Sequence, residues 1–175
     1  MPDPEAVRWL PGGETFLWTS EGDFARGFGP ALRATRAADG VLLRNVTLPA
    51  AFQPHTHEKI GPRDNDSLEG LALTPDSRTA WVAMEGPWLQ DGPRATPQSG
   101  GAPVRITAID VESGRALRQI AYPPDAVPHQ SPLPRGYTTN GVSEILADGP
   151  DHLLVLERSY TLGVGNSIRL YRIAL

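Results

Sequence analysis

Three pairs of glutamates carry the clearest indication of chemistry in this sequence. The pairs are Glu5 with Glu21, Glu69 with Glu85, and Glu144 with Glu157. Each pair brackets two short apolar runs joined by a turn, so an antiparallel hairpin would bring both carboxylates of a pair to one end. Crowded carboxylates repel unless a cation, arginines or bound protons offset their charge, and oxygen ligands of this kind suit Ca²⁺. We therefore expect the glutamates to gather at one end of the fold around a calcium ion.

The glutamates and their neighbours supply candidate site residues of three kinds. The candidate catalytic residues are Glu69, Glu85, Glu144 and Glu157. The candidate calcium ligands are Glu5, Glu21, Asn65, Glu69, Glu85, Asn140 and Glu144. The candidate substrate-binding residues are Arg8, Lys59, Arg63 and Arg158. Basic side chains, and the planar guanidinium above all, suit phosphate or carboxylate groups. Alternatively, the glutamates bond backbone groups or arginines of neighbouring units, and the basic residues only neutralise them.

Other motifs add little to this picture. His55 and His57 have strand spacing and would supply half of a metal site, but without a partner motif such a pair more often has another role. The sequence contains no P-loop, no dinucleotide-binding fingerprint and no Gly-x-Ser-x-Gly nucleophile motif.

The glutamate pairs belong to a repeated unit. Residues 5–22 align with residues 69–86 without a gap, and a third copy begins at Glu144. The downstream segment 34–49 aligns with 108–123, and 167–175 gives a third, shorter version. Each unit therefore consists of a strand, a tight turn, a strand, a long loop, a strand, a turn and a strand. Repeated four-stranded units of this size are typical of β-propeller blades.

The predicted fold is all-β, with about three propeller-like blades of four antiparallel strands in units 3–49, 66–123 and 140–175. Strands are expected near 5–10, 14–20, 31–37, 41–48, 69–74, 79–85, 104–110, 115–122, 142–147, 152–157 and 167–174. Residues 31–38 look helical by propensity, but their counterpart at 105–112 alternates like a strand, so we predict a strand. We expect three strands rather than four in the third unit. Three units make about half a ring, so we expect the missing blades to come from a longer chain or a second copy.

Composition limits the classes of partner. The chain has 175 residues, 39% of them hydrophobic and 21% charged, with 18 glycines and 18 prolines. A net charge of -4 and a single lysine argue against nucleic-acid binding and against a basic membrane patch. The absence of cysteine excludes disulfides and thiolate sites. No apolar stretch has membrane-spanning length, and the first five residues do not show a signal-peptide pattern.

Several of these segments resemble the bacterial phytase-like propeller family, described as "esterase-like activity of phytase". The strongest resemblance is in residues 65–76 and 84–92. Residues 141–146 with 153–158 are similar to a later motif of that family, and residues 4–8 with 20–22 to its preceding blade. The resemblance covers nearly the whole chain. It implies a propeller that hydrolyses ester or phosphoester bonds and is usually periplasmic or secreted.

Three functions are compatible with these features. The first is a calcium-assisted phosphoester or ester hydrolase acting on a small molecule, in which carboxylates hold Ca²⁺ and arginines hold the substrate. The second is a calcium-dependent sugar-lactone hydrolase, resembling the lactonase propellers. The third is a non-catalytic binding propeller, because the fold alone does not select a function.

Overall fold

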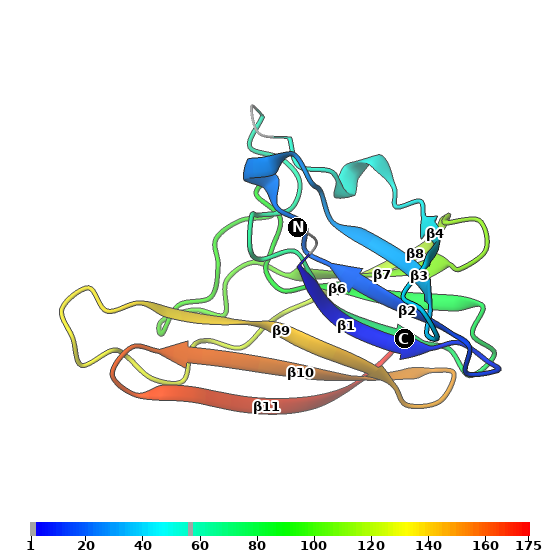
Figure 1. Cartoon of the computed structure of the whole chain (residues 1–175). Helices are drawn as coiled ribbons and strands as arrows, with labels where there is room; N and C mark the ends of the chain where they lie inside the picture. Colours follow the sequence, from blue (N-terminus) through cyan, green and yellow to red (C-terminus); the bar gives the residue numbers. More distant parts are fainter. Residues whose placement is uncertain (1–2, 56–57) are drawn as a thin grey trace.

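The protein folds as three antiparallel β-sheets (Figure 1). A computed structural model describes residues 3–55 and 58–175, and within these ranges the chain forms eleven strands and no α-helix. The first sheet contains β1 (Pro4–Trp9), β2 (Thr15–Ser20), β3 (Ala31–Arg36) and β4 (Leu42–Val46). The second contains β5 (Leu68–Leu73), β6 (Thr79–Met84), β7 (Val104–Asp110) and β8 (Ala116–Tyr122). The third contains β9 (Thr138–Ala147), β10 (His152–Thr161) and β11 (Gly165–Ala174).

The all-β prediction is confirmed, and strands consecutive in the chain are neighbours in each sheet. Residues 31–36 form a strand despite their helical propensity, because alternation places Leu32 and Ala34 in the core. The third sheet differs in length from the prediction. There β9 and β10 pair from Leu153–Ala147 through to Thr161–Thr138, so both strands extend four residues further than expected. Two short 3₁₀ helices, η1 (Phe24–Arg26) and η2 (Ala50–Phe52), lie in loops.

The three sheets stack, with the second sheet in the middle. Strand β5 contacts both β1 and β9, so the first strands of the three sheets meet along one line. The central strands β5 and β6 are buried along nearly their whole length. In Figure 1 the third sheet lies below the others, and its end near the β10–β11 turn projects beyond them. One continuous core joins the sheets, with fully buried side chains such as Leu17, Leu71, Ile106 and Leu153.

The first strand of each sheet is irregular at a corresponding place. The pairing register shifts between Pro4 and Val7 in β1 and between Leu68 and Gly70 in β5. In the third sheet Val142 pairs with Glu157 and Glu144 with Leu156, which leaves Ser143 as the extra residue. A β-bulge of this kind changes the direction in which a side chain points. In the part of the chain that the structure describes, no helix is long and apolar enough to cross a membrane.

Candidate functional site

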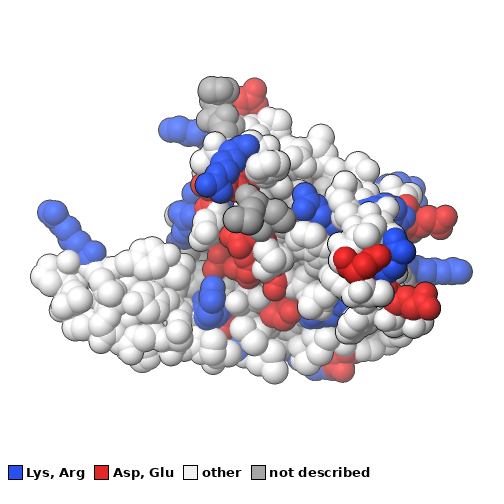
Figure 2. Space-filling view, viewed as in Figure 1, with Lys and Arg blue, Asp and Glu red and all other residues white. Residues whose placement is uncertain are grey.

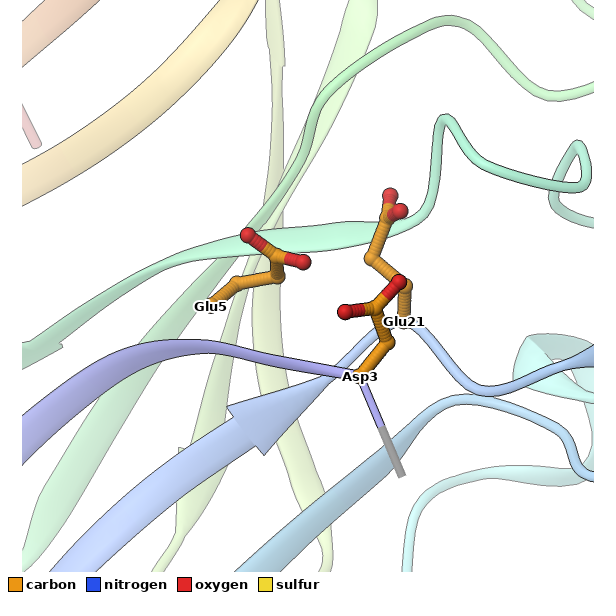
Figure 3. A group of neighbouring side chains, drawn as sticks. All are labelled: Asp3, Glu5 and Glu21. Atoms are coloured by element: carbon orange, nitrogen blue, oxygen red, sulfur yellow. The ribbon is translucent and has the colours of Figure 1, made fainter. Parts of the chain in front are cut away.

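Carboxylates from the first two sheets gather at one end of the inner strands. One carboxylate oxygen from each of Glu21, Glu69 and Glu85 lies within 4.8 Å of the other two, and the same holds for Asp3, Glu5 and Glu21. Figure 3 shows Asp3, Glu5 and Glu21 directing their side chains toward a common space from β1 and from the end of β2. We call these five residues, Asp3, Glu5, Glu21, Glu69 and Glu85, the carboxylate cluster.

Hairpin closure explains why these residues meet. The amide of Glu85 donates to the carbonyl of Ser67 at 2.7 Å, and the amide of Glu21 donates to the carbonyl of Asp3 at 3.0 Å. Each second-strand glutamate is thereby held beside the start of its own first strand, which is the arrangement that hairpin geometry predicts for Glu69 and Glu85. Glu21 also reaches the second sheet, where its Oε1 accepts the Ser67 amide at 2.6 Å. The cluster therefore spans the first two sheets.

Burial makes the cluster retain protons. It raises the pKa of Glu69 to about 9, and the charges of Glu85, Glu5 and Glu21 add to the effect. Burial likewise raises the pKa values of Glu21 and Glu85 to about 7. The pKa of Glu5 is raised by burial and by the Asp3 charge, while a side-chain hydrogen bond with Glu69 opposes the rise. At neutral pH the folded protein thus holds Glu69 largely protonated, because the low-dielectric site disfavours several adjacent negative charges.

The cluster lines a cleft of about 440 Å³. The other lining residues are Asn65, Asp66, Tyr137, Thr139, Arg158, Tyr160 and Asn166. Figure 2 shows acidic atoms in a hollow, with basic side chains around it. Arg158 lies on this cleft with its Nη2 atom 3.8 Å from Glu85 Oε1, and its charge offsets part of the rise in the pKa values of Glu5, Glu69 and Glu85. Asp66 forms an ion pair with Arg94. The cleft therefore offers acidic groups together with one guanidinium.

The third sheet does not contribute glutamates to the cluster, which corrects the expectation that all six would gather. The bulge at Ser143 in β9 corresponds to Glu69 in β5, so Glu144 stands one residue beyond the equivalent position. By the same register Arg158, not Glu157, corresponds to Glu85. A one-residue slip moves a strand side chain to the opposite face. The third sheet consequently places Arg158 on the cleft and turns Glu144 and Glu157 away.

Glu157 joins the second and third sheets. Its side chain is only 1% exposed and accepts hydrogen bonds from Tyr122 Oη at 2.6 Å and from Asn140 Nδ2 at 2.6 Å. The Asp125 amide lies at 3.2 Å, and Asn140 Oδ1 accepts from the Ser159 hydroxyl at 2.8 Å. A buried carboxylate with this many donors is a structural link. Glu157 and Asn140 therefore lie apart from the carboxylate cluster.

Glu144 lies where the three inner strands meet. Its Oε1 accepts the Leu71 amide at 3.1 Å and the Ile145 amide at 2.8 Å, while its Oε2 lies 2.9 Å from Arg8 Nη2. Arg8 also donates to the Ile145 carbonyl at 2.8 Å. Arg8 and Glu144 thus connect the first and third sheets and do not lie on the cleft.

The remaining candidates occupy loops. Lys59 is exposed, and Arg63 donates to the carbonyls of Pro87 and Gly92 at 2.9 and 2.7 Å. Asn65 adopts a left-handed conformation with φ of 55° and lines the cleft. His55 forms a bridge with Ile60, whereas His57 lies outside the described residues.

Sequence reasoning missed Asp3, Asp66 and Tyr160 as cleft residues. Asp3 had a usable indication, because it directly precedes the first strand, as Ser67 precedes β5. Asp66 lies in a loop and Tyr160 near the end of β10, and the repeated sequence pattern does not extend to either position.

Comparison with known proteins identifies the family. No curated protein matches the sequence significantly. Among solved structures, a chain of Kuenenia stuttgartiensis hydrazine synthase aligns over 97% of this chain with 16% identity and a TM-score of 0.32. This chain spans 50% of that structure's length. The family model named phytase-like, and described as esterase-like activity of phytase, matches residues 1–175. The chain therefore belongs to the phytase-like family.

Proposed function

We propose that this protein acts as an esterase-like hydrolase that cleaves phosphoester or ester bonds of a small molecule with the help of Ca²⁺. Family membership supports the hydrolase class. The observation that carries the site assignment is the convergence of five carboxylates on a cleft that also holds Arg158.

The residues present fit a calcium ion. Ca²⁺ takes six to eight oxygen ligands in flexible geometry, and Asp3, Glu5 and Glu21 offer carboxylate oxygens within 4.8 Å of one another. Beside them, the Ser67 hydroxyl is buried and lacks a hydrogen-bond partner among the described residues, although the Ser67 amide donates to Glu21. The raised pKa values indicate that the carboxylate cluster holds protons at neutral pH, and a bound cation would displace them. Binding should therefore strengthen as pH rises.

We assign Asp3, Glu5 and Glu21 to the cation, and Glu69, Glu85 and Arg158 to the substrate. A bound cation would polarise the ester oxygen and make attacking water more acidic. Arg158 is half exposed beside Glu85 and suits an anionic substrate oxygen. Glu85, with a pKa of about 7, would accept a proton from the attacking water, whose oxygen forms the new bond. Glu69 would donate a proton to the departing oxygen as the ester bond breaks, because burial raises its pKa more than that of Glu21 or Glu85, to about 9 in the calcium-free protein.

Hydrolysis assays test this proposal. The protein should cleave 4-nitrophenyl phosphate or a 4-nitrophenyl carboxyl ester with calcium present and lose that activity in a chelator. Glu85→Gln should abolish cleavage, while Glu14→Gln, which changes an exposed glutamate outside the cleft, should leave it unchanged. Cleavage of sugar lactones alone would instead favour the lactonase alternative. Calcium binding without hydrolysis of any of these compounds would favour a binding protein.

We also propose that the three sheets are consecutive blades of a β-propeller. The first and third sheets each bury one face against the middle of the molecule and leave the other open. Val7, Trp9 and Leu42 are exposed on the first sheet, and Ile168 and Leu170 on the third. Contiguous exposed apolar surface of this kind marks an interaction site. The occupant we propose is a further sheet of the same kind on each face, supplied by additional blades of a longer protein or by a second copy.

A further inference from the structure

A second cleft lies beside the carboxylate cluster and differs from it in charge. Its volume is about 490 Å³, within the range of small-molecule sites. Arg63, Arg94 and Asp64 supply its charged groups, and Phe24, Pro54 and Leu89 supply apolar surface. The two clefts are neighbours, because Asp66 lines the carboxylate cleft and pairs with Arg94 of the second cleft.

Arg63 is held in place without a carboxylate partner. Its Nε donates to the Pro87 carbonyl at 2.9 Å and its Nη2 donates to the Gly92 carbonyl at 2.7 Å. Among the described residues it forms no ion pair with a carboxylate. A guanidinium carries five N–H donors, and Nη1 makes no hydrogen bond within the described part of the chain. The side chain is therefore oriented by backbone carbonyls and retains donor capacity.

Arg94 adds a second guanidinium to the same cleft. Its Nε bonds Asp66, which is only 8% exposed, while the Arg94 side chain remains 47% exposed. Burial lowers the pKa of Arg63, and the charge of the neighbouring Arg94 guanidinium adds to this effect. Asp66 offsets part of this repulsion, and Asp64 is an exposed acid that also lines the cleft. An anion bound between Arg63 and Arg94 would offset the remaining repulsion between the two guanidiniums.

We infer that this cleft binds a small organic oxyanion, a phosphate, phosphonate or carboxylate attached to an apolar group. The guanidinium forks suit the oxyanion, and Phe24, Pro54 and Leu89 suit the apolar group. The inference rests on this geometry and does not require the carboxylate cluster to be catalytic. If the cluster hydrolyses esters, the second cleft selects substrates that carry such an acidic group, because Asp66 of the carboxylate cleft pairs with Arg94 of the second cleft.

Titration with phenylphosphonate, a compound without an ester bond, tests the inference. Saturable binding is expected by calorimetry and should weaken by about tenfold or more in Arg63→Gln and in Arg94→Gln, since each variant removes a charge-assisted contact. Arg118→Gln, an exposed arginine on β8, is the matched control and should bind like the unchanged protein. Inorganic phosphate should bind more weakly than phenylphosphonate, because it lacks the apolar group.

Two results would overturn the inference: no saturable binding, or binding equally strong in the Arg63 and Arg94 variants. Thermal melts establish that each variant is folded, and Arg94, being half exposed, provides a test that does not disturb the Pro87 and Gly92 carbonyls. Calcium binding measured on the same Arg63 variant should be unchanged. Failure of phenylphosphonate binding alone would therefore leave the proposed calcium site standing.

Discussion

Replacing Glu69 with glutamine should stabilise the calcium-free protein at neutral pH. Glu69 is 8% exposed, and burial among other carboxylates raises its pKa from 4.5 to about 9. At pH 7 the unfolded chain carries Glu69 ionised, whereas the folded protein holds it protonated. Taking up that proton on folding lowers the free energy of unfolding by about 1.4 kcal/mol for each pH unit above the pKa of the unfolded chain, or by roughly 3 kcal/mol at pH 7. Glutamine carries no charge in either state, and its amide can donate to Glu5.

The gain should depend on pH in a defined direction. The pKa of Glu69 is raised on folding, so the associated stability is complete below pH 4.5 and is lost as pH rises toward 9. Glu69→Gln should thus match the unchanged protein near pH 4.5 and exceed its free energy of unfolding by about 1–3 kcal/mol at pH 7. Urea unfolding in chelator, followed by tryptophan fluorescence, measures this difference. Glu14→Gln is the control for an exposed charge. A destabilised Glu69 variant, or a difference that does not vary with pH, would refute the reasoning.

Three other predictions follow from packing and from the open faces. Tyr122→Phe should lower the free energy of unfolding by about 2 kcal/mol, because the buried Glu157 loses a donor; an unchanged urea midpoint would contradict this. Gly141→Ala should lower the free energy of unfolding by about 1–3 kcal/mol and weaken hydrolysis, since the new Cβ would lie 2.6 Å from Glu85 Cγ. Full hydrolytic activity in that variant would show that Glu85 does not depend on this contact. Light scattering of residues 1–175 alone should show self-association, and a monodisperse 18.9 kDa monomer with a cooperative melt would rule it out.

Much of the strand arrangement could be predicted, because local patterns determine it. The Pro11–Gly13 turn places two glycines at φ values of 93° and 71°, which glycine adopts without strain and which permit the tight β1–β2 connection. The ungapped match between the first two units then placed Glu69 and Glu85 together. Both units carry the register irregularity at the same distance from the turn, so sequence alignment and structural register agree there.

The third unit could not be aligned correctly from glutamates alone. Its bulge lies at Ser143, which shifts Glu144 and Glu157 by one residue relative to the second unit. Pairing register depends on backbone hydrogen bonds that residue identity does not reveal. The burial of Glu157 depends on Tyr122, which is 35 positions away in the chain. Loop contacts such as the Asp66–Arg94 ion pair likewise arise from tertiary packing, which no periodic pattern describes.

Calcium titration by isothermal calorimetry tests the central claim most directly. We expect saturable binding that strengthens between pH 6 and pH 8, as Glu21 and Glu85, with pKa values of about 7, lose their protons. Glu21→Gln should abolish this binding, because Glu21 belongs to both groups of converging carboxylates, and Glu14→Gln should retain it. An absence of binding at pH 8, or equal binding by the Glu21 variant, would contradict the assignment of a calcium site to the carboxylate cluster.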